Sequence, residues 1–194
     1  MEDDLDRLRV PLAAMMRWFH AAGIRAAVIG GVAASLLGKP RLTKDIDAVV
    51  LDTDAEALLE SGAAFGFVAR MTDAREFARN TRMLLRYAEG NIDIDLSLGA
   101  LPFETEVIER SSMIDVGAGV SIRIASPEDI IIMKAIAGRA RDVMDIENII
   151  QATPALDVDR IRRWVREFSS VLELPEIHDD LERLLRRRQR WQPG

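Results

Sequence analysis

The segment 28–50, VIGGVAASLLGKPRLTKDIDAVV, constrains the fold of this 194-residue chain more than any other. Residues 26–29 form a short apolar run that predicts a buried strand, and Gly30-Gly31 turns the chain out of it. A short helical stretch follows. The sequence DIDAVVL at 45–51 then predicts a second strand, because apolar residues alternate with and directly follow the acids. This order requires a fold in which strands and helices are mixed.

The acids of the second predicted strand point to the chemistry. Asp45 and Asp47 project to one face, roughly 6.5–7 Å apart, and such a pair repels itself unless a cation lies between. Carboxylate oxygens suit Mg²⁺ (or Mn²⁺), which takes a few carboxylates plus substrate phosphates. The predicted strand 91–98, which contains the sequence IDIDLSL, adds Asp93 and Asp95 on one shared face. A third acid there would complete a two-metal site; we favour Asp95, as metal ligand and as the base that takes a hydroxyl proton, and Asp93 stays the alternative.

Gly30 and Gly31 fit the nucleotide half of such a site. Without a Cβ, their backbone can approach a phosphate, and the helix that follows presents its N-terminus to an anion. Taken alone, Gly-Gly is usually a turn and Asp-x-Asp a solvated strand edge. Their order, with thirteen residues between the second glycine and the first acid, favours phosphoryl or nucleotidyl transfer.

The remaining pattern is mixed up to residue 125 and mainly helical after it. Helices are predicted at 5–22, 32–38, 54–64, 102–111, 127–138, 141–151, 157–169 and 179–190. Strands are predicted at 66–70, 81–88 and 91–98, with a turn at Glu89-Gly90, and a hairpin spans 112–124. We therefore predict an α+β fold with a small mixed β-sheet core flanked by helices over residues 1–125, which include an N-terminal helix. A C-terminal helical region follows over residues 126–194.

Composition removes several classes of protein. With no cysteine, disulfides, Cys-ligated zinc and thiol nucleophiles are excluded, and only two histidines, His20 and His178, argue against a His-based zinc site or a Ser-His-Asp triad. The net charge of −6 argues weakly against bulk attraction to nucleic acid. The acidic N-terminus is not expected to be a signal peptide, and no apolar run is long enough for a membrane span, so we expect a cytoplasmic protein without a membrane partner.

These motifs resemble the nucleotidyltransferase superfamily of the DNA polymerase β type. Its signature is hydrophobic-Gly-Gly/Ser, a gap, Asp-hydrophobic-Asp-hydrophobic, and a third acid on a later strand. Within it, over about residues 25–150, the chain most resembles the AbiEii/AbiGii toxin family, on the blocks RLTKDID, IDLSLGALPFE and KAIAGRARDVMDIENI. Lincosamide-type antibiotic nucleotidyltransferases share similar blocks. The resemblance implies that residues 1–125 form a nucleotidyltransferase catalytic core.

The resemblance also implies roles for single residues. It makes Asp45, Asp47 and Asp95 the catalytic and metal-binding acids, with an NTP as substrate. The residues that would contact this nucleotide are Gly30 and Gly31 at the triphosphate, Arg41, Thr43 and Lys44 beside the nucleotide, and Lys134 at the triphosphate. Asp142 and Asp145 match an Asp-x-x-Asp of the same block as Lys134. From the residues alone, this acid pair is equally well explained by ordinary helix pairs and a cap, and the lysine by a side chain that reaches the surface.

Three functions follow as alternatives. The first is metal-dependent transfer of an NMP from an NTP to a hydroxyl of RNA, such as the tRNA 3′ end, by a toxin restrained by an antitoxin protein. The Arg-rich stretch 183–190 favours RNA, although a solvated helix face explains it as well. The second is transfer to a small hydroxylated antibiotic of the aminoglycoside or lincosamide type, which the acidic composition favours. The third is a nucleotide-binding protein of the same fold without turnover.

Overall fold

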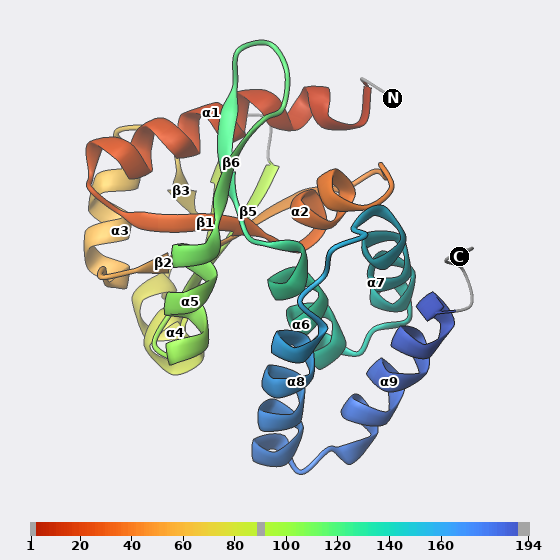
Figure 1. Cartoon of the computed structure of the whole chain (residues 1–194). Helices are drawn as coiled ribbons and strands as arrows, with labels where there is room; N and C mark the ends of the chain where they lie inside the picture. Colours follow the sequence, from red (N-terminus) through yellow and green to blue (C-terminus); the bar gives the residue numbers. More distant parts are fainter. Residues whose placement is uncertain (1–2, 89–91, 190–194) are drawn as a thin grey trace. The chain divides into compact units, whose positions relative to one another are not determined.

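The computed structural model describes residues 3–88 and 92–189, and these form two compact units (Figure 1). The first unit holds the chain up to Val32 together with Arg41–Ala125, and the second holds Ala33–Pro40 and the chain from Ser126 onward. The predicted α+β class is confirmed, since a mixed sheet with helices makes up the first unit and helices the second. The turn expected at Glu89-Gly90 lies outside the described residues.

One mixed sheet of seven strands, counted over the described residues, organises the first unit in the order β3-β4-β5-β2-β1-β7-β6. The strands are β1 (Arg25–Ile29), β2 (Asp45–Leu51), β3 (Val68–Ala69), β4 (Met83–Ala88), β5 (Ile92–Leu98), β6 (Ser112–Asp115) and β7 (Ser121–Ile124). Strand β2 is central, antiparallel to β1 and parallel to β5. Its run from Ala48 to Leu51 is wholly buried, as expected for a strand that is covered on both faces.

Helices α1 and α3 cover one face of this sheet. The helices of the first unit are α1 (Asp3–Ala21), α3 (Ala55–Ala63), α4 (Ala74–Thr81) and α5 (Pro102–Arg110), and α2 (Gly30–Leu37) begins there. Trp18 of α1 is fully buried; its Nε1 donates to Ser61 Oγ of α3 at 2.8 Å, and its ring lies 5.5 Å from the Arg86 guanidinium of β4. Trp18 and Arg86 therefore pack together between α1 and the sheet, on the face of β4 to which the Arg86 side chain points.

Helix α4 and strand β3 differ most from the sequence prediction for the first unit. Helix α4 was not expected, because its sequence AREFARNT buries only two small residues, Ala74 and Ala78, among polar ones. Such a helix has no broad apolar stripe from which to recognise it. Strand β3 has two residues, whereas a strand was predicted over 66–70, because only Val68 and Ala69 pair with β4.

The second unit contains the four C-terminal helices, drawn in teal to blue in Figure 1. They are α6 (Pro127–Ala137), α7 (Ala140–Ala152), α8 (Val158–Leu172) and α9 (Pro175–Gln189). Ser126 caps α6 by accepting from the Asp129 amide, and Gly138 ends it in the left-handed conformation at φ 62°. Helix α9 begins four residues earlier than predicted, because Pro175 occupies its first position rather than separating it from α8.

The helices of the second unit pack around isoleucines and a buried ion pair. Ile130, Ile131 and Ile149 are fully buried, and Arg160 of α8 donates to Asp129 of α6 at 2.7 Å. Among the helices of the described ranges, none is long and apolar enough to cross a membrane.

Candidate active site

Four carboxylates lie on one face of the two central strands. Strands β2 and β5 are parallel and pair Asp45 with Asp93 and Asp47 with Asp95. Side chains of directly paired residues, and of residues two apart on one strand, point to the same face of a sheet. The residues that alternate with these acids are fully buried on the opposite face. The pairing therefore gathers the two acidic motifs of the sequence, and we call these four residues the strand acids.

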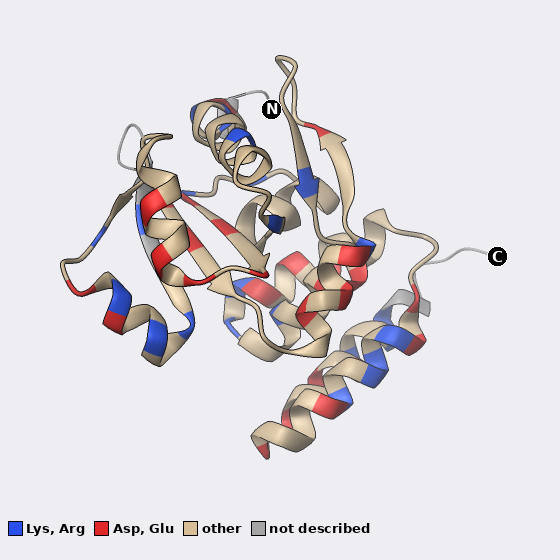
Figure 2. Cartoon of the chain, turned by 90° about the vertical axis from the view of Figure 1, so that its left-hand side faces the viewer, with Lys and Arg blue, Asp and Glu red and all other residues tan. Residues whose placement is uncertain are grey.

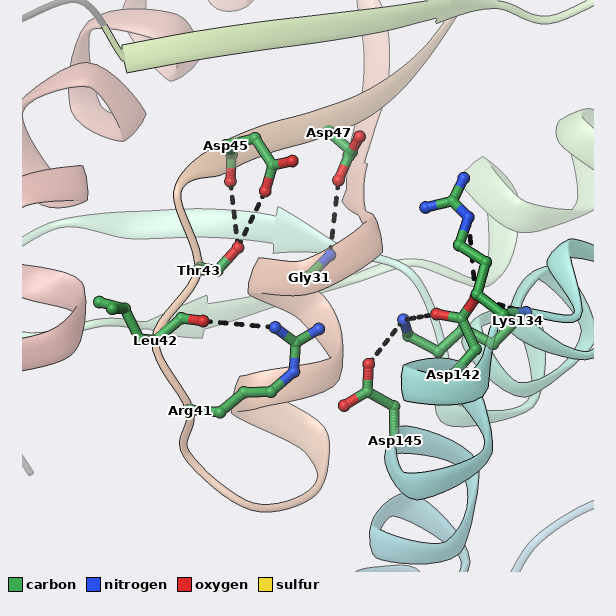
Figure 3. A network of polar contacts seen from close by, with 10 residues as sticks. Gly31, Arg41, Leu42, Thr43, Asp45, Asp47, Lys134, Asp142 and Asp145 are labelled. Carbon is green, nitrogen blue, oxygen red and sulfur yellow. Dashed lines mark hydrogen bonds and ion pairs between the residues drawn. The ribbon is translucent and has the colours of Figure 1, made fainter.

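A buried threonine supports the first strand acid (Figure 3). Thr43 Oγ1 donates to Asp45 Oδ1 at 3.0 Å, and the Thr43 residue is only 3% exposed. Arg7 of α1 donates to the Thr43 carbonyl at 2.6 Å and so holds this segment to α1. The resemblance placed Thr43 beside the nucleotide; in the structure, its hydroxyl orients the Asp45 carboxylate.

The two glycines make room for the strand acids. A Cβ on Gly30, whose φ is +64°, would lie 1.9 Å from Asp47 Oδ2, and one on Gly31 would lie 2.6 Å from Thr43 Oγ1. The Gly31 amide, at the start of α2, donates to Asp47 Oδ2 at 3.4 Å (Figure 3). The backbone at Gly30-Gly31 therefore lies close to a protein carboxylate, and its predicted approach to a triphosphate stays a prediction.

Asp95 is held by a residue that the sequence analysis did not single out. Arg70, directly after β3, places Nη1 2.9 Å from Asp93 Oδ2 and Nη2 3.0 Å from Asp95 Oδ1. Asp95 Oδ1 is buried and accepts no hydrogen bond of good geometry from the described residues. Burial raises the pKa of Asp95; the Arg70 charge lowers this pKa, and Asp45 and Asp93 raise it further. The sum of these effects is a raised pKa for Asp95.

Arg70 could not be found from the sequence because its partners lie 23 and 25 residues further along the chain. It is one of many arginines in an Arg-rich chain and belongs to no recognisable motif. Only the pairing of β3 with β4 and of β4 with β5 places it near the acids.

The other basic residues expected in the first unit line the loop before β2. Arg41 is half-buried, and its Nη1 donates to the Leu42 carbonyl at 3.4 Å (Figure 3). Lys44 is exposed and precedes Asp45 directly. Their roles beside a nucleotide stay predictions.

Lys134 belongs to the second unit, where it forms a buried cluster. Its Nζ lies 2.8 Å from Asp142 Oδ1 and 2.7 Å from Asp145 Oδ2 of α7, and each of the three residues is at most 7% exposed (Figure 3). Asp142 Oδ2 also accepts from the Arg139 amide at 3.3 Å and so caps α7. We call these three residues the helix cluster. The lysine does not reach the surface, and in this structure its charge is neutralised by the acids that share its sequence block.

The strand acids fit a hard divalent cation in their chemistry. They offer carboxylate oxygens only, and these oxygens are the ligands that Mg²⁺ and Mn²⁺ prefer. Among residues 3–88 and 92–189, no three His, Asp or Glu side chains converge closely enough to hold a metal ion by themselves. Substrate phosphates commonly complete such sites, so the acids fit a metal that arrives with a nucleotide.

A family model defines the class of this protein. Residues 9–184 match the family described as "Nucleotidyl transferase of unknown function (DUF2204)". The chain belongs to this family and is an enzyme of the nucleotidyltransferase class. A search of curated proteins gave no match.

Solved structures share the fold at low sequence identity. An antigenic nucleotidyltransferase-like protein from Paracoccidioides brasiliensis superposes with a TM-score of 0.56 at 16% identity, over 91% of this chain and 93% of that one. The solution structure of the antibiotic-resistance factor ANT(2'')-Ia gives 0.58 at 18% identity, over 90% and 98%. The same factor in complex with adenylyl-2''-tobramycin gives 0.56 at 18%, over 86% and 99%. These likenesses establish the nucleotidyltransferase fold.

Proposed function

We propose that this protein transfers a nucleoside monophosphate from an NTP to a hydroxyl group and releases pyrophosphate, with Mg²⁺ or Mn²⁺ held by Asp45, Asp47 and Asp95. The observation that carries this proposal is the in-register pairing of β2 with β5, which sets these acids on one sheet face. Asp45 and Asp47 are each supported by an uncharged donor, the Thr43 hydroxyl and the Gly31 amide. These two donors orient the carboxylates without adding a positive charge of their own.

The chemistry divides between the metal and the chain. When bound, divalent ions supply the positive charge that offsets the charge on the triphosphate and on the attacking and leaving oxygens. Asp95 accepts the proton of the acceptor hydroxyl, whose oxygen forms the new bond to the α-phosphorus. The bond from that phosphorus to the bridging oxygen breaks, and pyrophosphate leaves. The burial that raises the Asp95 pKa makes this carboxylate a stronger base than an exposed one.

We propose a small hydroxylated molecule of the aminoglycoside or lincosamide type as the acceptor. Two of the C-terminal arginines that favoured RNA have acidic partners within the second unit: Arg183 pairs with Asp180, and Arg187 Nη1 lies 2.8 Å from Glu147 Oε1. Acidic residues are interspersed with basic ones along the C-terminal helices (Figure 2). Paired arginines offer little free charge to a phosphate backbone. The fold also matches a factor solved with an adenylylated aminoglycoside.

The second candidate keeps the AbiEii/AbiGii interpretation, in which the acceptor is RNA such as the tRNA 3′ end and an antitoxin protein restrains the enzyme. The blocks RLTKDID and IDLSLGALPFE support it. Both candidates need an NTP, and we place both in the cytoplasm.

Nucleotidyl transfer tests the proposal directly. The full chain is incubated with Mg²⁺, each of the four α-labelled NTPs, and either a panel of aminoglycosides and lincosamides or total tRNA. An Asp45→Asn/Asp47→Asn double variant runs beside it. The matched control is Asp52→Asn, an exposed acid just after β2 that pairs with Arg25 at 3.0 Å.

We expect label to move to a small molecule in the wild-type and Asp52→Asn proteins and not in the double variant. Label on tRNA would select the second candidate. No transfer to any acceptor, or transfer that survives in the double variant, would overturn the proposal.

A further inference from the structure

We propose that Arg70 is a positioning residue that holds Asp95 as the third acid, with Asp93 as its anchor. This inference rests on the proposed function and deepens it. One guanidinium nitrogen of Arg70 lies 2.9 Å from Asp93 Oδ2, and the other terminal nitrogen lies 3.0 Å from Asp95 Oδ1. A single planar group therefore bridges the two acids of β5.

The geometry calls for arginine rather than lysine. Asp93 and Asp95 are two residues apart on a strand, and the fork of a guanidinium presents two nitrogens in a fixed plane that can contact both at once. The Arg70 side chain is only 17% exposed, so its position is restricted by its surroundings. Its contact with Asp95 uses Oδ1, which leaves Oδ2 of that carboxylate as the oxygen for the acceptor proton.

The Thr43 hydroxyl donates to Asp45 and the Gly31 amide donates to Asp47, while the guanidinium of Arg70 contacts both acids of β5. A base must be held in place without losing all of its charge, and a cation shared between two carboxylates leaves one net negative charge on the pair.

This arrangement also separates the roles of the two β5 acids. The Asp93 side chain is 46% exposed and that of Asp95 25%. Asp93, the more exposed of the two, anchors the arginine. Asp95, the more buried of the two, pairs with Asp47 across the strands and would take part in the reaction. We therefore assign Asp95 as the third acid and Asp93 as a positioning residue.

Turnover of variants tests the assignment. We expect Arg70→Gln to lower kcat about 10- to 100-fold, as losses of groups that orient metal ligands do, with KM for the NTP little changed. Arg70→Lys keeps the charge without the fork and should stay close to Arg70→Gln. Asp93→Asn should reproduce the loss, and the Arg70→Gln/Asp93→Asn double variant should be no worse than either single variant, because both remove the same contact.

Metal binding provides a readout without NTP or acceptor. Removing the Arg70 charge beside four carboxylates should tighten Mn²⁺ binding, measured by titration calorimetry, by about threefold or more. The same variant would then bind metal more tightly and turn over more slowly, a combination that loss of folding does not produce. The matched control is Arg75→Gln, because Arg75 also makes a two-nitrogen ion pair, with Glu56 on the surface of the same unit.

The outcomes separate this inference from the proposed function. Wild-type kcat in Arg70→Gln, or equal effects of Arg70→Gln and Arg75→Gln, would overturn the positioning role while nucleotidyl transfer stands. A large kcat loss in Asp93→Asn that adds to that of Arg70→Gln would also overturn it. A wild-type protein that neither binds Mn²⁺ nor transfers a nucleotide would overturn the proposed function and the inference together.

Discussion

The strand acids and the helix cluster both combine aspartates with a basic residue, but their carboxylates are paired with that residue to different extents. In the helix cluster, one lysine meets two aspartates at 2.7 and 2.8 Å, and all three residues are buried. In the strand acids, Arg70 contacts Asp93 and Asp95, and burial raises the pKa of Asp95. The lysine of the helix cluster is paired with both of its acids, whereas the strand acids include one residue, Asp95, whose charged form is disfavoured by burial. We take this difference as support for the proposed cation and substrate site at the strand acids.

The largest expected effect separates the two groups by activity. Asp47→Asn removes one strand acid but keeps its shape, and we expect nucleotidyl transfer to fall on the order of 10³-fold or more. Thermal unfolding should change little, because the amide still accepts from Gly31. Activity and melting temperature are measured on the same preparation. Substantial residual activity in a folded Asp47→Asn protein would remove this residue from the site.

In the helix cluster, we expect a substitution to lower the stability of the protein. Lys134→Met leaves two buried carboxylates without their cation, so we expect a loss of stability of about 3–5 kcal/mol in urea unfolding. A Lys134→Met/Asp142→Asn/Asp145→Asn triple variant removes the unpaired charges and should recover part of that loss. If Lys134→Met instead keeps its stability and raises KM for the NTP, the lysine contacts the triphosphate, as the resemblance implied.

A substitution at Gly30 tests whether activity depends on the close approach of its backbone to the Asp47 carboxylate. In Gly30→Ala the new Cβ would lie 1.9 Å from Asp47 Oδ2, so the carboxylate must move, and we expect activity to fall about 10²-fold. Gly23→Ala is the matched control, because Gly23 has nearly the same φ, +65°, and its Cβ would meet nothing within 4 Å. Both variants should lose about 1–2 kcal/mol of stability to backbone strain. Equal activities would show that only the backbone conformation matters.

The smallest effect concerns the pH dependence of stability. Because burial raises the folded pKa of Asp95, its ionised form is disfavoured in the folded protein. The penalty is absent below the unfolded pKa and is fully present once pH exceeds the folded pKa. Metal-free Asp95→Asn should therefore melt about 2 °C higher than wild type at neutral pH and show no gain in acid. A lower melting temperature at neutral pH would mean that the Arg70 contact outweighs burial.

The sequence predicted those parts of the molecule that local patterns determine. Strand β2 begins and ends at the predicted residues, because its acids and the apolar run after them are both local signals. The resemblance implied a third acid on a later strand, whereas the parallel pairing that joins Asp47 to Asp95 across 48 residues, and its register, are properties of the folded sheet.

The remaining features depend on contacts between distant segments. Arg70 reaches its acids only through β3 and β4, and no spacing in the sequence reveals it. The resemblance implied that Thr43 lies beside a nucleotide, and this stays a prediction; its burial and its bond to Asp45 arise from packing of the loop against α1. The ion pairs of Lys134 bridge two helices, and a charge pattern alone does not distinguish such a buried cluster from a ligand site.

Mn²⁺ titration, followed by electron paramagnetic resonance of the free ion, tests the central claim most directly. The proteins compared are the wild type, the Asp45→Asn/Asp47→Asn variant and the Lys134→Met/Asp142→Asn/Asp145→Asn variant, each in the presence of a non-hydrolysable NTP analogue. We predict that binding is lost when the strand acids are changed and retained when the helix cluster is changed. Retained binding in the first variant, or loss only in the second, would contradict the assignment of the metal to the strand acids.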